Sequence, residues 1–275
     1  MTYVTTDDDT RLFCRSWGEG PAVVFCHGWA MNSDVWQPVL ARLADAGFRA
    51  IAYDRRGHGR SDDPGRGYDL DTLADDLATV LEAFELTEAT LVGHSMGAQE
   101  VVRYLTRYDG ARVARVVMVA PALPYPARMS DNPDGYADPE QSAAMRAAIV
   151  ADFAGFLAQA APPAFGPETS PAQLEQAIRM MLQTSVQAAI ETNAALTGAD
   201  LRAELPNVRV PTLILHGDAD QLVPIEATSR RVLQLVPGSR LEVYAGGRHP
   251  MLTSHAARIA ADVASFVVEA EKAAA

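Results

Sequence analysis

A serine stands between two glycines in the run Gly93-His94-Ser95-Met96-Gly97. Residues 89–92 before it are apolar or β-branched, which favours a buried parallel strand, and the apolar residues of 98–108 after it have helical spacing. A serine on such a strand–turn–helix is held in a strained backbone conformation, and the flanking glycines let strand and helix approach each other closely. This context predicts that Ser95 is a catalytic nucleophile.

A serine nucleophile needs a base to take its proton and a carboxylate to orient that base. On a sheet of this kind the acid and then the histidine follow the serine in sequence, each just after a later strand. Asp218 and Asp220 follow a predicted strand over 211–216, and His249 follows the next predicted strand, 240–244. We expect His249 to be the base. Spacing alone does not choose between the two aspartates, because both lie in the same loop.

A third element lies near the N-terminus, where a predicted strand over 22–26 is followed by His27-Gly28-Trp29-Ala30. This is where one backbone N–H of an oxyanion hole is expected, here that of Trp29, with a second N–H from Met96. The Trp29 side chain is open to two interpretations, a pocket wall or part of the core, and we expect it to bind substrate as a pocket wall. The cysteines and histidines lack metal-site spacing and no glycine-rich nucleotide motif follows a strand, so we expect no metal and no cofactor.

Six further motifs lie at residues 53–61, 68–72, 74–77, 216–221, 223–224 and 252–256. They resemble those of one group of known proteins, the cofactor-free bacterial haloperoxidases and related aryl esterases of the α/β-hydrolase superfamily. The similarity covers roughly residues 1–120 and 206–270. It implies a metal-free serine hydrolase that forms an acyl-enzyme, in a group whose members often let hydrogen peroxide replace water as acyl acceptor.

The resemblance also bears on the acid. It places the carboxylate three residues after Gly217 and four before Pro224, which is the position of Asp220. Asp218 is then expected to fix the loop by accepting hydrogen bonds from backbone N–H groups.

The chain departs from this family at three places. The family commonly has proline after the aromatic residue of the oxyanion loop, a further glycine after the serine turn, and proline just before the histidine; this chain has Ala30, Ala98 and Arg248 there. Because proline fixes φ near about −65°, we expect Ala30→Pro to shift the carbonyl of residue 30 and raise perhydrolysis relative to hydrolysis. With Ala30 in place, we expect a hydrolase with weak perhydrolase activity.

The elements that must position these residues are eight predicted strands. Strands over 2–6 and 11–17 form a hairpin, and the later strands alternate with helices. This predicts an α/β fold, a mostly parallel eight-stranded α/β-hydrolase sheet flanked by helices, with ligands beyond the carboxyl ends of the strands.

No strand pattern occurs between 121 and 205, a segment rich in proline, alanine, methionine and glutamine. We expect a core made of residues 1–120 and 206–275 and a helical cap insertion over residues 121–205. Its methionines are open to two interpretations, an adaptable apolar pocket or ordinary packing within the cap. They include Met129, Met145, Met180 and Met181.

The 275 residues carry a formal net charge of −12, which argues against nucleic acid and anionic membranes as partners. No stretch approaches about 18 uncharged apolar residues, so we expect no transmembrane helix. The N-terminus does not have the pattern of a secretory signal, and Cys14 and Cys26 are expected to be buried, reduced thiols. We therefore expect a cytoplasmic protein; the sequence leaves a homo-oligomer open.

The expected function is hydrolysis of small apolar carboxylic esters through an acyl-enzyme on Ser95, so that the partner is a small-molecule ester or lactone. Two alternatives remain open. The same triad could act as a lactonase or amidase, depending on the cap. In a different class, the chain could be a ligand-binding receptor on a hydrolase scaffold, although a pure binder need not keep all three triad residues.

Overall fold

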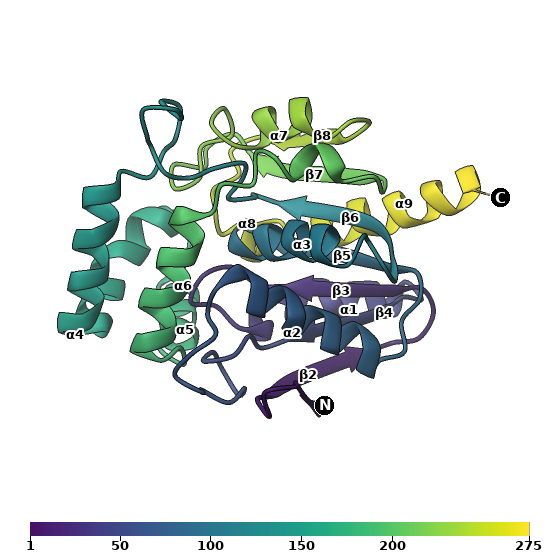
Figure 1. Ribbon diagram of the computed structural model, residues 1–275, viewed down its shortest axis with the longest axis horizontal. Coiled ribbons are helices and arrows are strands. Elements are labelled where there is room, and N and C mark those ends of the chain that lie inside the picture. Colours follow the sequence, from purple (N-terminus) through teal and green to yellow (C-terminus); the bar gives the residue numbers. More distant parts are fainter. Residues whose placement is uncertain (275) are drawn as a thin grey trace.

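An eight-stranded sheet forms the centre of the protein in the computed structural model, which describes residues 1–274 and the side chains of residues 1–270. Its strand order is β1-β2-β4-β3-β5-β6-β7-β8 (Figure 1). β2 pairs antiparallel with β1 and β4, and every other pair is parallel. The predicted mostly parallel eight-stranded sheet is confirmed. The strands are β1 (Thr2–Thr5), β2 (Arg11–Trp17), β3 (Ala22–Cys26), β4 (Arg49–Tyr53), β5 (Ala89–His94), β6 (Val113–Val119), β7 (Thr212–Gly217) and β8 (Arg240–Tyr244).

Helices cover both faces of this sheet. One apolar core joins it to α1, α8 and α9, and a second core joins its other face to α2, α3 and α7. The helices are α1 (Gln37–Asp45), α2 (Leu70–Ala83), α3 (Met96–Arg107), α4 (Pro139–Phe165), α5 (Pro171–Met181), α6 (Val186–Gly198), α7 (Ser229–Leu235), α8 (Met251–Ser254) and α9 (Ala256–Ala274), with 3₁₀ turns η1 (Ser33–Trp36) and η2 (Leu205–Asn207).

The parallel strands are apolar throughout because each of their faces is buried. Successive side chains of a strand point to opposite faces. In β3, Val23 and Phe25 belong to the core with α1 and α9, whereas Val24 belongs to the core with α2 and α3. A strand covered on both faces therefore has no alternation of apolar and polar residues in its sequence.

Three helices, α4, α5 and α6, separate β6 from β7. Figure 1 shows them grouped beyond the carboxyl ends of β3 and β6, at the edge of the sheet where Ser95 lies. Residues 121–205, all of which the structure describes, contain these helices and two isolated β-bridges but no strand. α5 begins with a capping box, in which Ser170 and Gln173 each accept the other's backbone N–H.

α4 is kinked in its middle, where Asp152 is extended (φ −161°, ψ 89°) and its Oδ1 accepts the N–H of Gly155 at 2.8 Å. By length and composition alone, this helix could cross a membrane, with a mean hydropathy of 1.3 over its most apolar 18 residues. Asp152 interrupts its apolar run, so the sequence contains no stretch of about 18 uncharged apolar residues here, and the expectation of no such helix is not met. The mostly buried core helix of a soluble protein meets the same test, but only 28% of this window is buried. The side chains of Phe153 and Leu157 pack against α5 and α6.

Candidate active site

Ser95 lies on the sharp turn between β5 and α3. Its backbone has φ 53° and ψ −115°, a conformation that costs energy for a residue with a Cβ. A Cβ on Gly97 would lie 2.3 Å from the carbonyl oxygen of Cys26, and one on Gly93 would lie 2.6 Å from the nitrogen of Ala98. The strained serine and the close approach that requires flanking glycines are therefore both confirmed.

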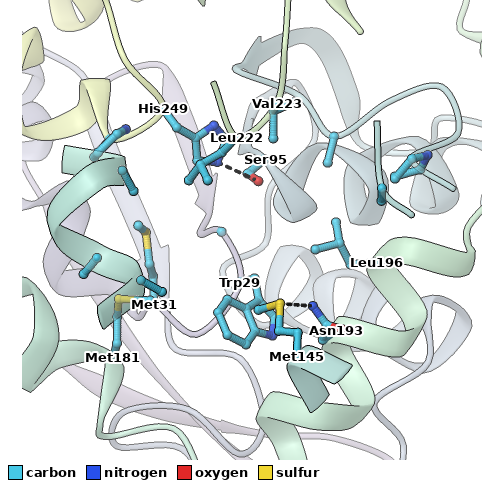
Figure 2. Close-up of a pocket in the computed structure, with 18 of the residues that line it drawn as sticks. Trp29, Met31, Ser95, Met145, Met181, Asn193, Leu196, Leu222, Val223 and His249 are labelled. Carbon is cyan, nitrogen blue, oxygen red and sulfur yellow. Dashed lines mark hydrogen bonds between the residues drawn. The ribbon is translucent and has the colours of Figure 1, made fainter. Parts of the chain in front are cut away.

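Ser95, His249 and Asp220 form one chain of hydrogen bonds (Figure 2). The Nε2 atom of His249 lies 3.1 Å from Ser95 Oγ, and its Nδ1 atom lies 2.7 Å from Asp220 Oδ2. Because an ionised carboxylate only accepts, Nδ1 carries the hydrogen and Nε2 is free to accept the serine proton. The structure thus brings these three expected residues together from loops after β5, β7 and β8.

The surroundings of Asp220 keep it ionised. Its Oδ1 accepts the N–H groups of Leu222 and Val223 at 3.0 and 2.9 Å, and its Oδ2 faces His249 and His216. Burial opposes ionisation, but His249, His216 and the Val223 N–H outweigh it, so the pKa of Asp220 lies below its ordinary value. A permanent carboxylate at this position can stabilise an imidazolium next to it.

The other aspartate of the loop, Asp218, has a different partner. It is exposed, and its Oδ1 accepts the backbone N–H of Gly246 at 2.7 Å. This is the loop-fixing contact expected of Asp218. Only Asp220 reaches His249, in the arrangement that the resemblance implies.

His216 contributes to the site through Asp220. Its Nε2 atom lies 2.9 Å from the Val223 carbonyl and 3.2 Å from Asp220 Oδ2, and its Nδ1 atom lies 2.6 Å from Ser229 Oγ. A carbonyl only accepts, so Nε2 carries the hydrogen and also donates to the carboxylate. This hydrogen bond holds the carboxylate of Asp220 in place.

The expected oxyanion loop follows β3 and runs against the serine turn. A Cβ on Gly28 would meet His94 Nδ1 at 2.8 Å and Ser95 Cβ at 3.5 Å, so this loop passes close to Ser95. α3 begins at Met96, whose N–H therefore belongs to the first helical turn and has no acceptor within the helix. This geometry suits the two donors predicted from Trp29 and Met96.

The side chain of Trp29 joins the oxyanion loop to α6. Its indole N–H donates to the carbonyl of Ala189 at 2.8 Å, and the ring lines the cavity beside Ser95 (Figure 2). One residue therefore couples the loop next to the nucleophile to a helix of the 121–205 segment.

The backbone at Ala30 bears on the expectation for proline at this position, where the family commonly has it. The residue is fully buried with φ 54°, and its carbonyl already accepts a hydrogen bond from Thr184 Oγ1 at 3.2 Å. Proline cannot adopt a positive φ, so Ala30→Pro would force the loop to rebuild rather than only shift one carbonyl. The backbone of Ala30 therefore predicts loss of activity in Ala30→Pro, in place of the gain in perhydrolysis expected from the sequence.

Ser95 and His249 open into a cavity of about 310 Å³. Its walls are mostly apolar and come from the oxyanion loop, the Leu222–Val223 segment and the helices α4–α6. This size and lining suit a small, largely apolar molecule. Met145 and Met181 line the cavity, whereas Met129 and Met180 do not.

Polar residues of the 121–205 segment that reach the cavity were missed from sequence. They are Tyr136, Asn193 and Thr197. Burial, reinforced by Asp220, raises the pKa of Tyr136, so its phenol stays a hydrogen-bond donor. No local motif marks these residues. Tyr136 lies in the loop before α4, whereas Asn193 and Thr197 lie on α6, so only the folding of the 121–205 segment brings them to one cavity.

Three histidines, His27, His58 and His94, are buried and uncharged. Burial is the main reason that the pKa values of His58 and His94 fall to about 3. The neutral His94 has its Nε2 atom 3.2 Å from the carbonyl of His249, which fixes the main chain of that residue. His58 Nδ1 donates in the same way to the carbonyl of Arg56 at 2.8 Å.

These shifts predict that acid destabilises the fold. Below about pH 6.5 the unfolded chain binds a proton at His58 that the folded chain refuses until about pH 3. Between these two pH values, each decrease of one pH unit therefore lowers the free energy of unfolding by about 1.4 kcal/mol because of this residue. His58→Asn keeps a donor for the carbonyl of Arg56 but has no group that titrates in this range. Free energies of unfolding from urea titrations between pH 6 and 4.5 are therefore expected to change less steeply with pH in the variant, by about that amount per pH unit. An unchanged slope would contradict the buried neutral histidine.

Neither cysteine of the chain lines the cavity. Among the described residues, no group of three or more His, Cys, Asp or Glu side chains could hold a metal. Cys14 and Cys26 are buried and unpaired, as expected, and burial raises the pKa of Cys14 to about 12.

Known proteins share both this sequence and this fold. A family model described as alpha/beta hydrolase fold matches residues 21–256. The chain is 38% identical over 273 residues to a non-heme haloperoxidase of Rhodococcus erythropolis, which covers 97% of this chain and 99% of that protein. It is 34% identical to a bifunctional esterase/perhydrolase of Acinetobacter calcoaceticus, with coverage of 97% and 99%.

A solved structure agrees with these relatives. The bromoperoxidase from Bacillus anthracis has a TM-score of 0.94 to this chain at 30% identity, covering 97% of this chain and 99% of that one. The match in sequence extends over almost the whole chain, and the match in structure includes both the sheet and the helices over the site. The chain therefore belongs to the α/β-hydrolase fold family.

Proposed function

We propose that this protein is a serine esterase that cleaves small apolar carboxylic esters through an acyl-enzyme on Ser95. One observation carries the proposal: an unbroken chain of hydrogen bonds from Ser95 through His249 to Asp220 opens into an apolar cavity of about 310 Å³. The relatives named as esterase and perhydrolase support the same chemistry.

The proposed reaction has two halves. Ser95 Oγ attacks the ester carbonyl while His249 takes its proton, and the N–H groups of Trp29 and Met96 bind the oxyanion. Collapse of this intermediate breaks the bond to the alcohol oxygen, which leaves with the proton from His249. Water then attacks the acyl-enzyme, gives its proton to His249 and releases the carboxylic acid, restoring Ser95. Asp220 keeps the imidazole oriented and stabilises its cationic form.

The same proposal assigns the parts of the chain. Residues 1–120 and 206–275 act as the core that carries the triad, and residues 121–205 act as a cap whose helices wall the cavity. A small-molecule ester, or a lactone opened by the same acyl-enzyme, fits this arrangement. The triad contacts disfavour a receptor that only binds. We also propose a cytoplasmic location, which the two buried, unpaired cysteines favour.

A graded series of p-nitrophenyl esters tests this activity. We expect saturable hydrolysis of the short-chain esters and falling kcat/KM once the acyl chain outgrows the cavity. Activity is expected to survive prolonged dialysis against EDTA, because each proposed step uses only protein groups. Loss of activity on dialysis and recovery with zinc would contradict this account, as would a lack of hydrolysis across the whole series.

Peroxide is the expected second acceptor. Relatives named as haloperoxidase and perhydrolase support it, since attack of hydrogen peroxide on the acyl-enzyme yields a peracid and free Ser95. The peracid then oxidises bromide and is itself reduced to the carboxylic acid. We expect the natural chain to brominate monochlorodimedone weakly, with acetate and peroxide present, beside much faster hydrolysis of p-nitrophenyl acetate.

Variants of Ala30 test the control of this ratio. Ala30→Pro is expected to lower both activities by about 100-fold, because rebuilding the loop displaces an oxyanion donor by about 1 Å or more. Ala30→Gly is the matched control, since glycine accepts φ 54° without strain and is expected to keep both rates. If Ala30→Pro stays active and raises only perhydrolysis, the loop tolerates proline and our interpretation of its backbone is wrong.

A further inference from the structure

The cavity has a polar group away from the catalytic residues. Asn193 of α6 lines it together with Met145 of α4 and Trp29, and Figure 2 shows these three apart from Ser95 and His249. Asn193 is only 3% exposed, so its amide is removed from bulk water. The walls around it are mostly apolar.

The orientation of this amide follows from its neighbours. Arg146 Nη1 lies 3.1 Å from Asn193 Oδ1, and a guanidinium can only donate. The carbonyl oxygen of the amide must therefore face Arg146. Its nitrogen must then face the opposite way, toward Met145 and the cavity.

The amide nitrogen is left with unused donor capacity. It carries two hydrogens, and its one acceptor among the described side chains is Met145 Sδ at 3.7 Å, a weak thioether acceptor. Buried donors without a good acceptor are costly and rare in folded proteins. The nearby Thr197 hydroxyl donates to the backbone carbonyl of Asn193. Among the described residues, the amide nitrogen makes no hydrogen bond to this hydroxyl.

We propose that Asn193 is a specificity-determining residue that donates a hydrogen bond to a keto, ester or ether oxygen of the substrate, remote from the scissile carbonyl. Arg146 acts as a positioning residue, because it fixes which end of the amide faces the cavity. The preferred substrates are then small esters with an apolar chain and one acceptor oxygen, rather than plain alkyl esters. This inference rests on the proposed esterase activity and names its substrate class.

Two matched substrate pairs test it. In the acyl pair, kcat/KM is measured for p-nitrophenyl 4-oxopentanoate and p-nitrophenyl pentanoate. In the alcohol pair, it is measured for 3-oxobutyl acetate and butyl acetate. Each ratio is divided by the ratio of the hydroxide-catalysed rates, which removes intrinsic reactivity. The natural chain is expected to prefer the keto member of one pair by about tenfold, the effect of one good hydrogen bond.

Variants assign this preference to the amide. Asn193→Leu removes the donor, and Asn193→Asp keeps a partner for Arg146 but offers no hydrogen; both are expected to bring the ratio to about 1 or below. Arg146→Met frees the amide to rotate and is expected to lower the ratio severalfold. Asn207→Asp makes the same charge change outside the cavity and is expected to keep the natural ratio.

The outcomes separate this inference from the proposed function. Ratios near 1 in both pairs for the natural chain, or a preference that survives Asn193→Leu in a variant with an unchanged melting temperature, would overturn the role of Asn193 while leaving the esterase intact. A natural chain that hydrolyses none of the four esters would overturn both.

Discussion

Replacing Ser95 with alanine is expected to lower kcat for p-nitrophenyl acetate by about a millionfold, and His249→Ala by a similar factor. Ser95 and His249 depend on each other, because the serine is a weak nucleophile until the imidazole takes its proton. Their hydrogen-bond distance of 3.1 Å makes that transfer direct. The double variant is therefore expected to lose little more than either single variant.

Matched variants control for the fold. Ser265→Ala and His255→Ala change the same residue types outside the cavity and are expected to keep hydrolysis near the natural rate. Melting temperatures of all variants show whether the protein still folds. A loss of less than about 100-fold in a folded Ser95→Ala protein would show that another group is the nucleophile.

The second large effect concerns the acid. Asp220→Asn is expected to lower kcat by about 10⁴-fold, because an amide can present its NH₂ group to His249 Nδ1 and leave the hydrogen on Nε2, where it blocks acceptance of the serine proton. Asp218→Asn is the control from the same loop. Among the described residues, its side chain has one hydrogen bond, to a backbone N–H, so its effect on kcat is expected to stay within about tenfold.

Equal losses in these two variants would leave the assignment of the acid without support. Asp220→Asn and Asp218→Asn are well matched, because both substitutions remove one negative charge from the same loop. What differs is the partner, since Asp220 lies 2.7 Å from the imidazole and Asp218 binds Gly246.

The sequence predicts the site well where local pattern determines structure. Ser95 is recognisable because its strand, turn and helix are contiguous, and the glycines that permit the turn lie within two residues of it. The alternation of strands and helices then brings the carboxyl ends of parallel strands to one edge, which places Asp220 and His249 near Ser95. Local spacing could not separate Asp218 from Asp220, since that depends on the path of one loop.

The rest of the site depends on contacts between distant segments. The positive φ of Ala30 accompanies a hydrogen bond from Thr184, and Trp29 is anchored on Ala189, more than one hundred residues away. Asn193 reaches the cavity only because α6 packs beside α4. No periodicity or motif within a short window contains this information, so the cavity walls became visible only in the folded chain.

The most direct test of the account is to trap the covalent intermediate. The protein is mixed with p-nitrophenyl acetate, quenched in acid within the first turnover, digested and analysed by mass spectrometry. We expect a burst of about one p-nitrophenolate per protein and one added acetyl group on the peptide that contains Ser95, with neither in Ser95→Ala. Hydrolysis at the full rate with no acetylated Ser95, or an acetyl group on a different residue that forms and decays at the turnover rate, would contradict the central claim.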